Sequence, residues 1–323
     1  MNLECEKITD RFEEDCKAFF FEQTTGNLWP YLYSEPQNEN DPVRGSVLYN
    51  EMLRKEKDYY LYSNESELLH NSGAQIASLI GPDATIVEMG PGGEKSFRDK
   101  TLPFLNTFTH LQGYVGVDIC QGFLETILEI VRVSFPGLFV TGFHQDFSRL
   151  ENLPVFAKSV IFFKGSTVGN LRDGEVRDLM SKFRRLISEG HYLVIVNDAN
   201  QDEVSLMKAY DNPGVAAFTE NIMYRVKRDL ELSEMMPDAF RYQPEWKKES
   251  YDFRHILVAT SGQKFHLRGR DVEIEKGQKL HILSSFKYPA EVFQEMVRPA
   301  GFEPVTVLPD ASERMTVHLF RAV

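Results

Sequence analysis

Hydrophobic and polar positions between residues 63 and 200 follow two alternating patterns. Apolar positions at helical spacing predict helices, and short apolar runs bounded by glycines predict strands. Because strands that alternate with helices usually form a parallel sheet covered on both faces, this region predicts an α/β fold. The first helix is predicted to begin with Ser63 or Asn64 as its cap. The predicted strands are 84–90, 113–118, 138–146, 159–165 and 191–199, and the predicted helices are 63–81, 122–135 and 174–188.

The pattern changes after residue 200. A polar, helical stretch at 201–235 is followed by three runs with a period of two, SYDFRHILVAT, KFHLRGRDVEIEKG and KLHILSSFKY, which predict an antiparallel meander. A helix at about 290–299 and the strands PVTVL and MTVHLFRAV end the chain. We therefore expect two domains, a Rossmann-like domain and an α+β domain built from the N-terminus and an insertion. Their predicted ranges are 63–200 with 288–323, and 1–62 with 201–287.

Composition narrows the possible partners. The 323-residue chain carries a formal charge of −12, which disfavours nucleic acid and anionic membranes because both select clustered Lys and Arg. Three scattered cysteines do not suit a disulfide framework or a cysteine-rich zinc site, and no metal is expected. The acidic N-terminal stretch does not resemble a signal peptide, and no apolar run approaches the length of a membrane span, so a cytoplasmic location is expected. The sequence does not indicate an oligomeric state.

A glycine-rich turn follows the first predicted strand. Glu88, Gly90 and Gly92 belong to the segment EMGPGGEK, and Asp118 ends the second strand 28 residues after Gly90. Glycines let a ligand approach the backbone, and an acid on the next strand can accept hydrogen bonds from ribose hydroxyls. The segment does not match GxGxxG, nor does it have the GK[ST] ending of a P-loop.

The third predicted strand ends in Asp146 followed by Phe147. A carboxylate beside an aromatic ring suits adenine, because it offers one anchor for the exocyclic amine and one stacking face. A glycine turn, a ribose acid and an adenine acid on three successive strands indicate an S-adenosylmethionine methyltransferase.

Several segments, in order, resemble the histidine-specific α-N-methyltransferases of ergothioneine biosynthesis. FFKGSTVGNL at 162–171 is similar to that family's FLGSTIGNL-type segment, and VEMGPGGEK at 87–95 to its VELGSG-EK loop. The resemblance runs from about residue 40 to the C-terminus. Its other segments are RGSVLYNEM at 44–52, DYY at 58–60, QDF at 145–147, KAYDNPGV at 208–215 and KLHILSSFKY at 279–288.

The resemblance implies roles for individual residues. The binding site for the cofactor, S-adenosyl-L-methionine, would be lined by Gly90, Lys95, Asp118, Asp146 and Phe147. The carboxylate of an amino-acid substrate would be bound by Asn170 and Tyr210, and its α-amino group positioned by Tyr59 and the backbone at Gly165.

Residue chemistry agrees with these roles. Methyl transfer from a sulfonium requires a neutral amine aligned with the carbon–sulfur bond, which is a task of positioning rather than of acid–base or metal catalysis. Plainer interpretations stay open, in which Asn170 caps the next helix or turn, Tyr59 and Tyr210 only pack, and Lys95 is a solvated helix residue.

One segment departs from the family pattern. The family carries an E-x-S-x-K-F/Y segment whose Glu and Ser hold the imidazole of histidine, and here Leu283 and Ser285 stand at those positions. His255 falls near a family position that is usually apolar. Since an apolar side chain cannot replace a charge-assisted hydrogen bond, we expect an aromatic or tryptophan-derived substrate, as in the fungal dimethylallyltryptophan N-methyltransferases of the same superfamily.

Three alternatives remain at this stage. Histidine could still be the substrate, with Ser285 and His255 compensating for the missing carboxylate. The chain could also be a non-catalytic cofactor-binding or partner-binding protein, or a methyltransferase of a macromolecule.

Overall fold

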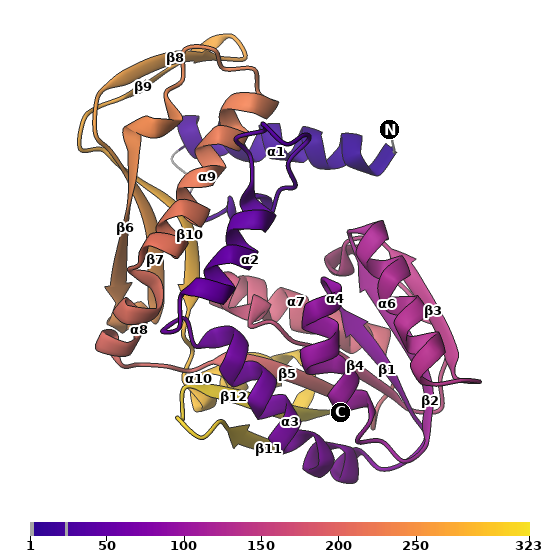
Figure 1. Cartoon of the computed structure of the whole chain (residues 1–323). Helices are drawn as coiled ribbons and strands as arrows, with labels where there is room; N and C mark the ends of the chain where they lie inside the picture. The colour runs from indigo at the N-terminus through magenta and orange to yellow at the C-terminus, as the bar shows by residue number, and fades with distance from the viewer. Residues whose placement is uncertain (1–2, 23–24) are drawn as a thin grey trace. The chain divides into compact units, whose positions relative to one another are not determined.

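The computed structural model describes residues 3–22 and 25–323, and the chain divides into two compact units (Figure 1). Unit 1 comprises Met1–Tyr60 and Gln201–Phe286, and unit 2 comprises Leu61–Asn200 and Lys287–Val323. The sequence predicted boundaries at 62/63, 200/201 and 287/288, and the assignment of the cofactor and the substrate to separate domains stays a prediction. No helix in the described part of the chain is long and apolar enough to cross a membrane.

Unit 2 is built on a seven-stranded sheet in the order β11-β12-β5-β4-β1-β2-β3. Strands β1 to β5 pair in parallel, whereas β12 is antiparallel to both β5 and β11. Every residue of β1 and β4 is buried, because a central parallel strand has both faces covered. The topology is Rossmann-like with a C-terminal antiparallel hairpin. The strands are β1 Ala84–Met89, β2 Leu111–Asp118, β3 Phe139–His144, β4 Ser159–Phe163, β5 Tyr192–Asp198, β11 Phe302–Pro309 and β12 Met315–Ala322.

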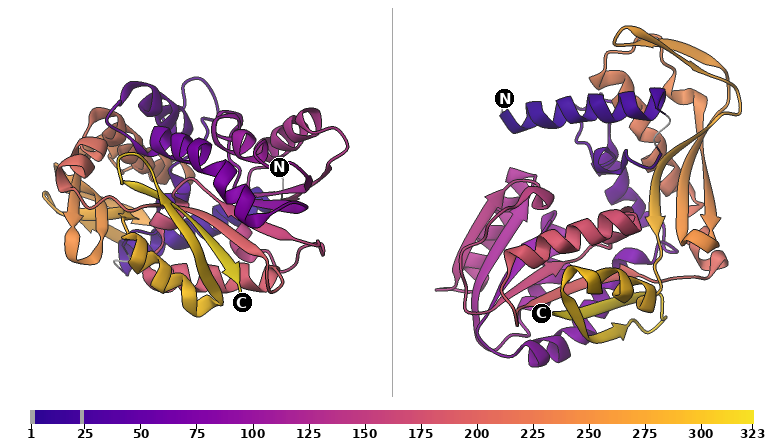
Figure 2. Two further views of the ribbon diagram at one scale, coloured as in Figure 1. Left: turned by 90° about the horizontal axis from the view of Figure 1, so that it is seen from below. Right: turned by 180° about the vertical axis from the view of Figure 1, so that it is seen from behind.

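Helices cover both faces of this sheet. Helices α3, α4 and α6 lie over one face in Figure 1, and the view from behind in Figure 2 shows α7 and α10 over the other. The predicted cap of the first helix is wrong, because α3 already begins at Leu61 and the Asn64 amide instead donates to the Asp310 carboxylate at 2.7 Å. The helices are α3 Leu61–Ile80, α4 Glu94–Ser96, a π-helical turn Phe97–Thr101, α5 Leu102–Leu105, α6 Gln121–Ser134, α7 Asp173–Leu186 and α10 Ala290–Val297, with 3-10 turns at Phe147–Arg149, Thr167–Asn170 and Arg298–Ala300.

Unit 1 contains a three-stranded antiparallel sheet, β10-β7-β6, and a separate hairpin, β8-β9. The meander predicted from the sequence is therefore only partly right, because KFHLRGRDVEIEKG folds back on itself. Arg268 and Gly269 both have positive φ, 45° and 88°, which closes a tight hairpin. The strands are β6 Phe240–Lys247, β7 Asp252–Ala259, β8 Gln263–Leu267, β9 Arg270–Ile274 and β10 Lys279–Phe286.

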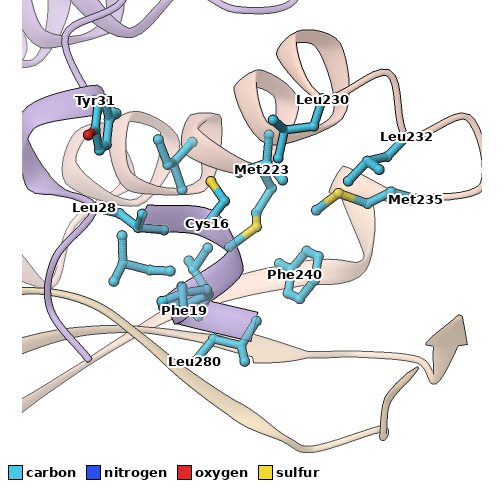
Figure 3. Close-up of a cluster of buried hydrophobic side chains, with 14 of the residues drawn as sticks. Cys16, Phe19, Leu28, Tyr31, Met223, Leu230, Leu232, Met235, Phe240 and Leu280 are labelled. Atoms are coloured by element: carbon cyan, nitrogen blue, oxygen red, sulfur yellow. The ribbon is translucent and has the colours of Figure 1, made fainter. Parts of the chain in front are cut away.

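The helices of unit 1 pack on this sheet through one apolar core. The segment 201–235, predicted as helical, forms two helices that separate where Asn212 caps the second and Pro213 begins it. Figure 3 shows side chains from the N-terminal helix and from the insertion meeting in this core, among them Phe19, Met223 and Phe240. The helices are α1 Leu3–Phe21, α2 Gly45–Lys55, α8 Glu203–Tyr210 and α9 Pro213–Asp229, with 3-10 turns at Trp29–Tyr31, Pro237–Ala239 and Lys248–Ser250.

Candidate functional site

The glycine loop follows β1 and needs two of its glycines for their backbone conformation. Gly90 and Gly92 have φ of +73° and +70°, a region that disfavours other residues. A Cβ on Gly90 would lie 3.8 Å from the ring of Phe147, whereas a Cβ on Gly92 would meet no atom of the described residues within 4 Å. The loop therefore exposes backbone at Gly92, where a ligand can approach closely.

Asp118 ends β2 and connects the glycine loop to the backbone just before α6. Its carboxylate accepts hydrogen bonds from the Gly92 amide at 3.1 Å and the Cys120 amide at 2.8 Å. The side chain is buried, and this burial raises the pKa of its carboxyl group despite the two backbone donors. Each carboxylate oxygen keeps a further lone pair for another donor.

Asp146 and Phe147 follow β3, which pairs in parallel with β2. Asp146 caps the 3-10 turn that begins at Phe147, with its carboxylate accepting from the Ser148 amide at 2.8 Å. The Phe147 ring lies edge-on to the ring of Phe163, 5.2 Å between centroids. Since the carboxyl ends of adjacent parallel strands lie at one edge of a sheet, Asp118, Asp146 and the glycine loop share that edge.

Glu88 is fully buried beneath the loop, and three groups in unit 2 engage its carboxylate. It accepts from the Thr101 hydroxyl and the Tyr114 hydroxyl, both at 2.6 Å, and lies 3.1 Å from the Lys164 ammonium. The Lys164 ammonium also donates to the Pro91 carbonyl at 2.8 Å. The structure thus places Glu88 behind the glycine loop rather than on its open side.

Lys95 lies on the exposed surface of α4. Its ammonium pairs with Asp99, one turn along the chain, and lies 5.0 Å from the centroid of the Tyr62 ring. With 67% of its side chain exposed, its position matches the solvated interpretation, and its contact with the cofactor stays a prediction.

The loop after β4 has an unusual backbone. Gly165 has φ +82° and Ser166, which is not glycine, has φ +51°. The Ser166 hydroxyl is buried and has no hydrogen-bond partner within the described ranges 3–22 and 25–323. Backbone strain and unpaired buried polar atoms of this kind concentrate at ligand-binding sites.

Asn170 closes the same loop without capping the next helix. Helix α7 begins at Asp173 and has Arg172 as its N-terminal cap residue, so the helix-cap interpretation of Asn170 is wrong. No side chain or backbone group in the described part of the chain hydrogen-bonds with the side-chain amide of Asn170. Its donor and acceptor are therefore available to a ligand.

Glu65 fixes the loop after β4 from the side of α3. Its carboxylate accepts from the Gly165 amide and pairs with the Lys100 ammonium, and both side chains are buried. Burial lowers the pKa of Lys100 although Glu65 opposes this shift. Sequence reasoning missed Glu65, Lys100 and Lys164, because the partners of all three lie on elements distant along the chain. The available signal was Lys164, a charged residue directly after three apolar strand positions.

In unit 1, several predicted substrate residues meet in one aromatic cluster. The Tyr210 ring lies 4.6 Å from Phe253, 5.1 Å from the His255 imidazole and 5.6 Å from Tyr59, measured between centroids. Packing is thus one role of both tyrosines. The cluster lies where α8 ends beside β7.

His255 is buried at the centre of this cluster, and both of its ring nitrogens are engaged. Nδ1 shares a hydrogen bond with the Tyr242 hydroxyl at 2.8 Å, and Nε2 shares one with the Ser285 hydroxyl at 3.3 Å. Leu283 pairs with His255 across β7 and β10, beside a bulge that shifts the register between His281 and Leu283. Leu283 is 8% exposed and belongs to the apolar core of unit 1.

The family comparison decides the identity. A model of the family described as "Histidine-specific methyltransferase, SAM-dependent" matches residues 29–322, most of the chain. The chain belongs to this family. It is therefore an S-adenosylmethionine-dependent N-methyltransferase, and unit 2 has the Rossmann-like fold of class I methyltransferases with a mixed seven-stranded sheet. Family membership identifies an enzyme rather than a silent binding protein.

Curated relatives of this methyltransferase differ in what their names describe. A Mycobacterium tuberculosis protein named histidine N-alpha-methyltransferase is 26% identical over 269 residues, covering 81% of this chain and 82% of the relative. The protein of that name from Mycolicibacterium smegmatis is 26% identical over 258 residues, covering 78% and 79%. The Aspergillus fumigatus protein named N-methyltransferase fsqC is 23% identical over 275 residues, covering 81% and 72%. At such identities the acceptor does not follow from the names.

The strand-end edge of unit 2 suits the cofactor of this methyltransferase. Gly92 offers open backbone, Asp118 offers carboxylate oxygens for hydroxyl donors, and Ser166 presents a buried hydroxyl that has no partner among the described residues. These groups match the polar, hydroxyl-bearing parts of an adenosyl ligand.

Proposed function

We propose that this methyltransferase transfers methyl groups to the α-amino nitrogen of a free aromatic or tryptophan-derived amino acid, giving an N-methylated product, up to a trimethylated betaine. The observation that best supports this proposal is that Leu283, an apolar residue, stands where the histidine-specific segment has Glu. Leu283 lies in an apolar core and pairs with His255 in a cluster of aromatic rings. Such surroundings favour a large, weakly polar side chain over an imidazole that needs a carboxylate.

Asn170 and Gly165 support an amino acid as the acceptor. The Asn170 amide is neutral, so it can bind a carboxylate without placing a positive charge near a sulfonium. The Gly165 backbone, fixed by Glu65 through its amide, can orient the amine. On this proposal Tyr59 and Tyr210 of the aromatic cluster also bind the amino acid, through their hydroxyls.

The chemistry needs little beyond this positioning. When bound, S-adenosylmethionine supplies a methyl group on a good leaving group, a neutral thioether after transfer. The residues of the chain need to hold the amine lone pair in line with the methyl carbon and let solvent remove the proton that the product ammonium releases. Each further methyl group requires the amine to rotate in the same place, which hydroxyl and carbonyl acceptors allow.

Histidine is the second candidate. Ser285 is retained at its family position, and two of the relatives above are named histidine N-alpha-methyltransferase. In unit 1 the Ser285 hydroxyl already shares a hydrogen bond with His255, which leaves it less able to bind a second imidazole.

The test is a panel of free amino acids incubated with the enzyme and methyl-labelled cofactor. The panel contains histidine, tryptophan, prenylated tryptophan, tyrosine and phenylalanine, each with a carboxyl-amidated derivative as its control. We expect label on the α-nitrogen of aromatic amino acids and at least tenfold less on the amides. Efficient trimethylation of histidine, with no aromatic acceptor, would overturn the substrate assignment.

A further inference from the structure

Among the described residues of unit 2, three ion pairs are almost completely removed from solvent. One, Lys287 with Asp198 at the end of β5, is 2% and 1% exposed, and the other two reach the loops of the candidate site. The side chains of Lys164 and Glu88 are 3% and 0% exposed, and those of Lys100 and Glu65 are 5% and 2% exposed. A buried ion pair is weak evidence for stability, because desolvation opposes the attraction between the charges and apolar residues often replace such a pair without loss. Two such pairs in one small region call for another role.

The first pair reaches the glycine loop. The Lys164 ammonium donates to the Pro91 carbonyl at 2.8 Å, between Gly90 and Gly92. The Gly92 amide is held from the other side by Asp118.

The second pair reaches the loop after β4. The Glu65 carboxylate accepts from the Gly165 amide, and Lys100 neutralises it from the opposite side. Because a peptide unit is planar, holding this amide fixes the orientation of the whole Lys164–Gly165 peptide. The positive φ values of Gly165 and Ser166 begin directly after this point.

We propose that the two pairs are separate positioning devices. Lys164, whose charge is balanced by Glu88, holds the glycine loop in its conformation and thereby determines the affinity for the cofactor. Glu65, whose charge is balanced by Lys100, holds the loop after β4 in its conformation and thereby determines the turnover of the acceptor. The second half rests on the proposed function, because it assigns the Gly165 loop to the acceptor, whereas the first half does not.

Cofactor affinity tests the first pair. Two double variants share the same Glu88→Gln change: one combines it with Lys164→Met and the other with Lys164→Gln. Both remove the two buried charges, but the Lys164→Gln change keeps an N–H donor at this position, whereas the Lys164→Met change leaves none. Titration calorimetry with S-adenosylhomocysteine should give the Met variant a Kd at least fivefold above that of the Gln variant. Equal Kd values would overturn the role of Lys164.

Turnover tests the second pair. Glu65→Leu and Glu65→Gln are each combined with Lys100→Met, so that neither variant leaves an unpaired buried lysine. The Gln variant keeps an oxygen that accepts from the Gly165 amide, and the Leu variant does not. We expect the Leu variant to have a kcat at least tenfold below that of the Gln variant, with Kd for S-adenosylhomocysteine within threefold between them. Equal kcat values, or a shift in Kd as large as the shift in kcat, would overturn the role of Glu65.

Two further measurements test the proposal if a variant fails to fold or if the enzyme methylates no amino acid. If a neutral pair at Lys164 fails to fold, the single variant Lys164→Arg keeps the charge but replaces the compact ammonium with a larger planar guanidinium. It should raise Kd at least threefold, and an unchanged Kd would overturn the role of Lys164. If the wild-type enzyme methylates no amino acid, the proposed function fails. Amide exchange at Gly165 then decides the second half: it should be fast in the Leu variant and slow in the wild type and the Gln variant, and equal exchange would contradict it.

Discussion

The edge of the sheet in unit 2 and the aromatic cluster in unit 1 are organised by different means. In unit 2 the candidate site consists largely of backbone, at Gly92 and Gly165, and buried charged side chains hydrogen-bond with that backbone. In unit 1 the groups are side chains, His255 and its hydroxyl partners among aromatic rings. On the proposed function, the backbone site would bind the cofactor that the family shares, whereas the side-chain site would change with single substitutions and so set substrate choice.

The largest expected effect breaks the backbone site. Asp118→Ala removes the acceptor of the Gly92 and Cys120 amides and the proposed ribose contact. We expect the affinity for S-adenosylhomocysteine to fall at least 100-fold, about 2.7 kcal/mol, as measured by calorimetry. Glu129→Gln, an exposed acid on α6, is the matched control and should bind normally. An Asp118→Ala variant that is folded and binds like the wild type would show that Asp118 is not part of the cofactor site.

The next effect changes the side-chain site without touching unit 2. Leu283→Glu restores the carboxylate of the histidine-specific segment, and Leu283→Gln provides a neutral control of the same size. We expect Leu283→Glu to shift the ratio of kcat/KM for histidine over tryptophan at least tenfold toward histidine, about 1.4 kcal/mol. The Gln variant should shift this ratio less. If both variants keep the wild-type ratio, Leu283 does not select the substrate.

A third prediction compares the two buried histidines. His255 has partners on both nitrogens, whereas the Nδ1 atom of His318 in β12 is buried without a partner among the described residues. Burial lowers the pKa of His318 to about 3. Since the unfolded chain has an ordinary histidine pKa of about 6.5, it binds more protons than the folded chain between these values. Stability contributed by this site is therefore present above pH about 6.5 and is lost as the pH falls, by up to about 1.4 kcal/mol per pH unit.

Calorimetric melting checks this sign. The transition of unit 2 is identified by its upward shift with S-adenosylhomocysteine. Between pH 7.5 and 5.5 its midpoint should fall less in His318→Leu than in the wild type. His110→Gln, which changes an exposed histidine of the same unit, should follow the wild type. An unchanged pH response in His318→Leu would assign the acid sensitivity to the carboxylates instead.

The smallest effect tests the hydroxyl partners of His255. Tyr242→Phe removes one hydrogen bond to Nδ1 and leaves the ring in place. A single neutral hydrogen bond contributes about 0.5–1.5 kcal/mol, so KM for the preferred amino acid should rise about three- to tenfold. The Kd for S-adenosylhomocysteine should not change. A rise in that Kd as well would mean that the two regions are not functionally separate.

The sequence predicted those features that local patterns determine. Alternating strands and helices predicted the parallel sheet, and the glycines at 90 and 92 marked the turn, because positive φ strongly selects glycine. The hairpin at Arg268 was missed because a non-glycine residue takes positive φ there. Glu65 and Lys100 were missed because their partners lie 35 and 100 residues away along the chain. No periodic pattern records a buried pair between distant elements.

Direct competition between two acceptors tests the central claim most directly. Equal concentrations of histidine and tryptophan are incubated with the wild-type enzyme and S-adenosylmethionine, and mass spectrometry follows the initial rates of α-N-methylation. We predict that methylated tryptophan forms at least tenfold faster, because Leu283 stands where the histidine-specific segment has Glu. Faster methylation of histidine would contradict this account and would mean that the imidazole is recognised without a carboxylate at that position.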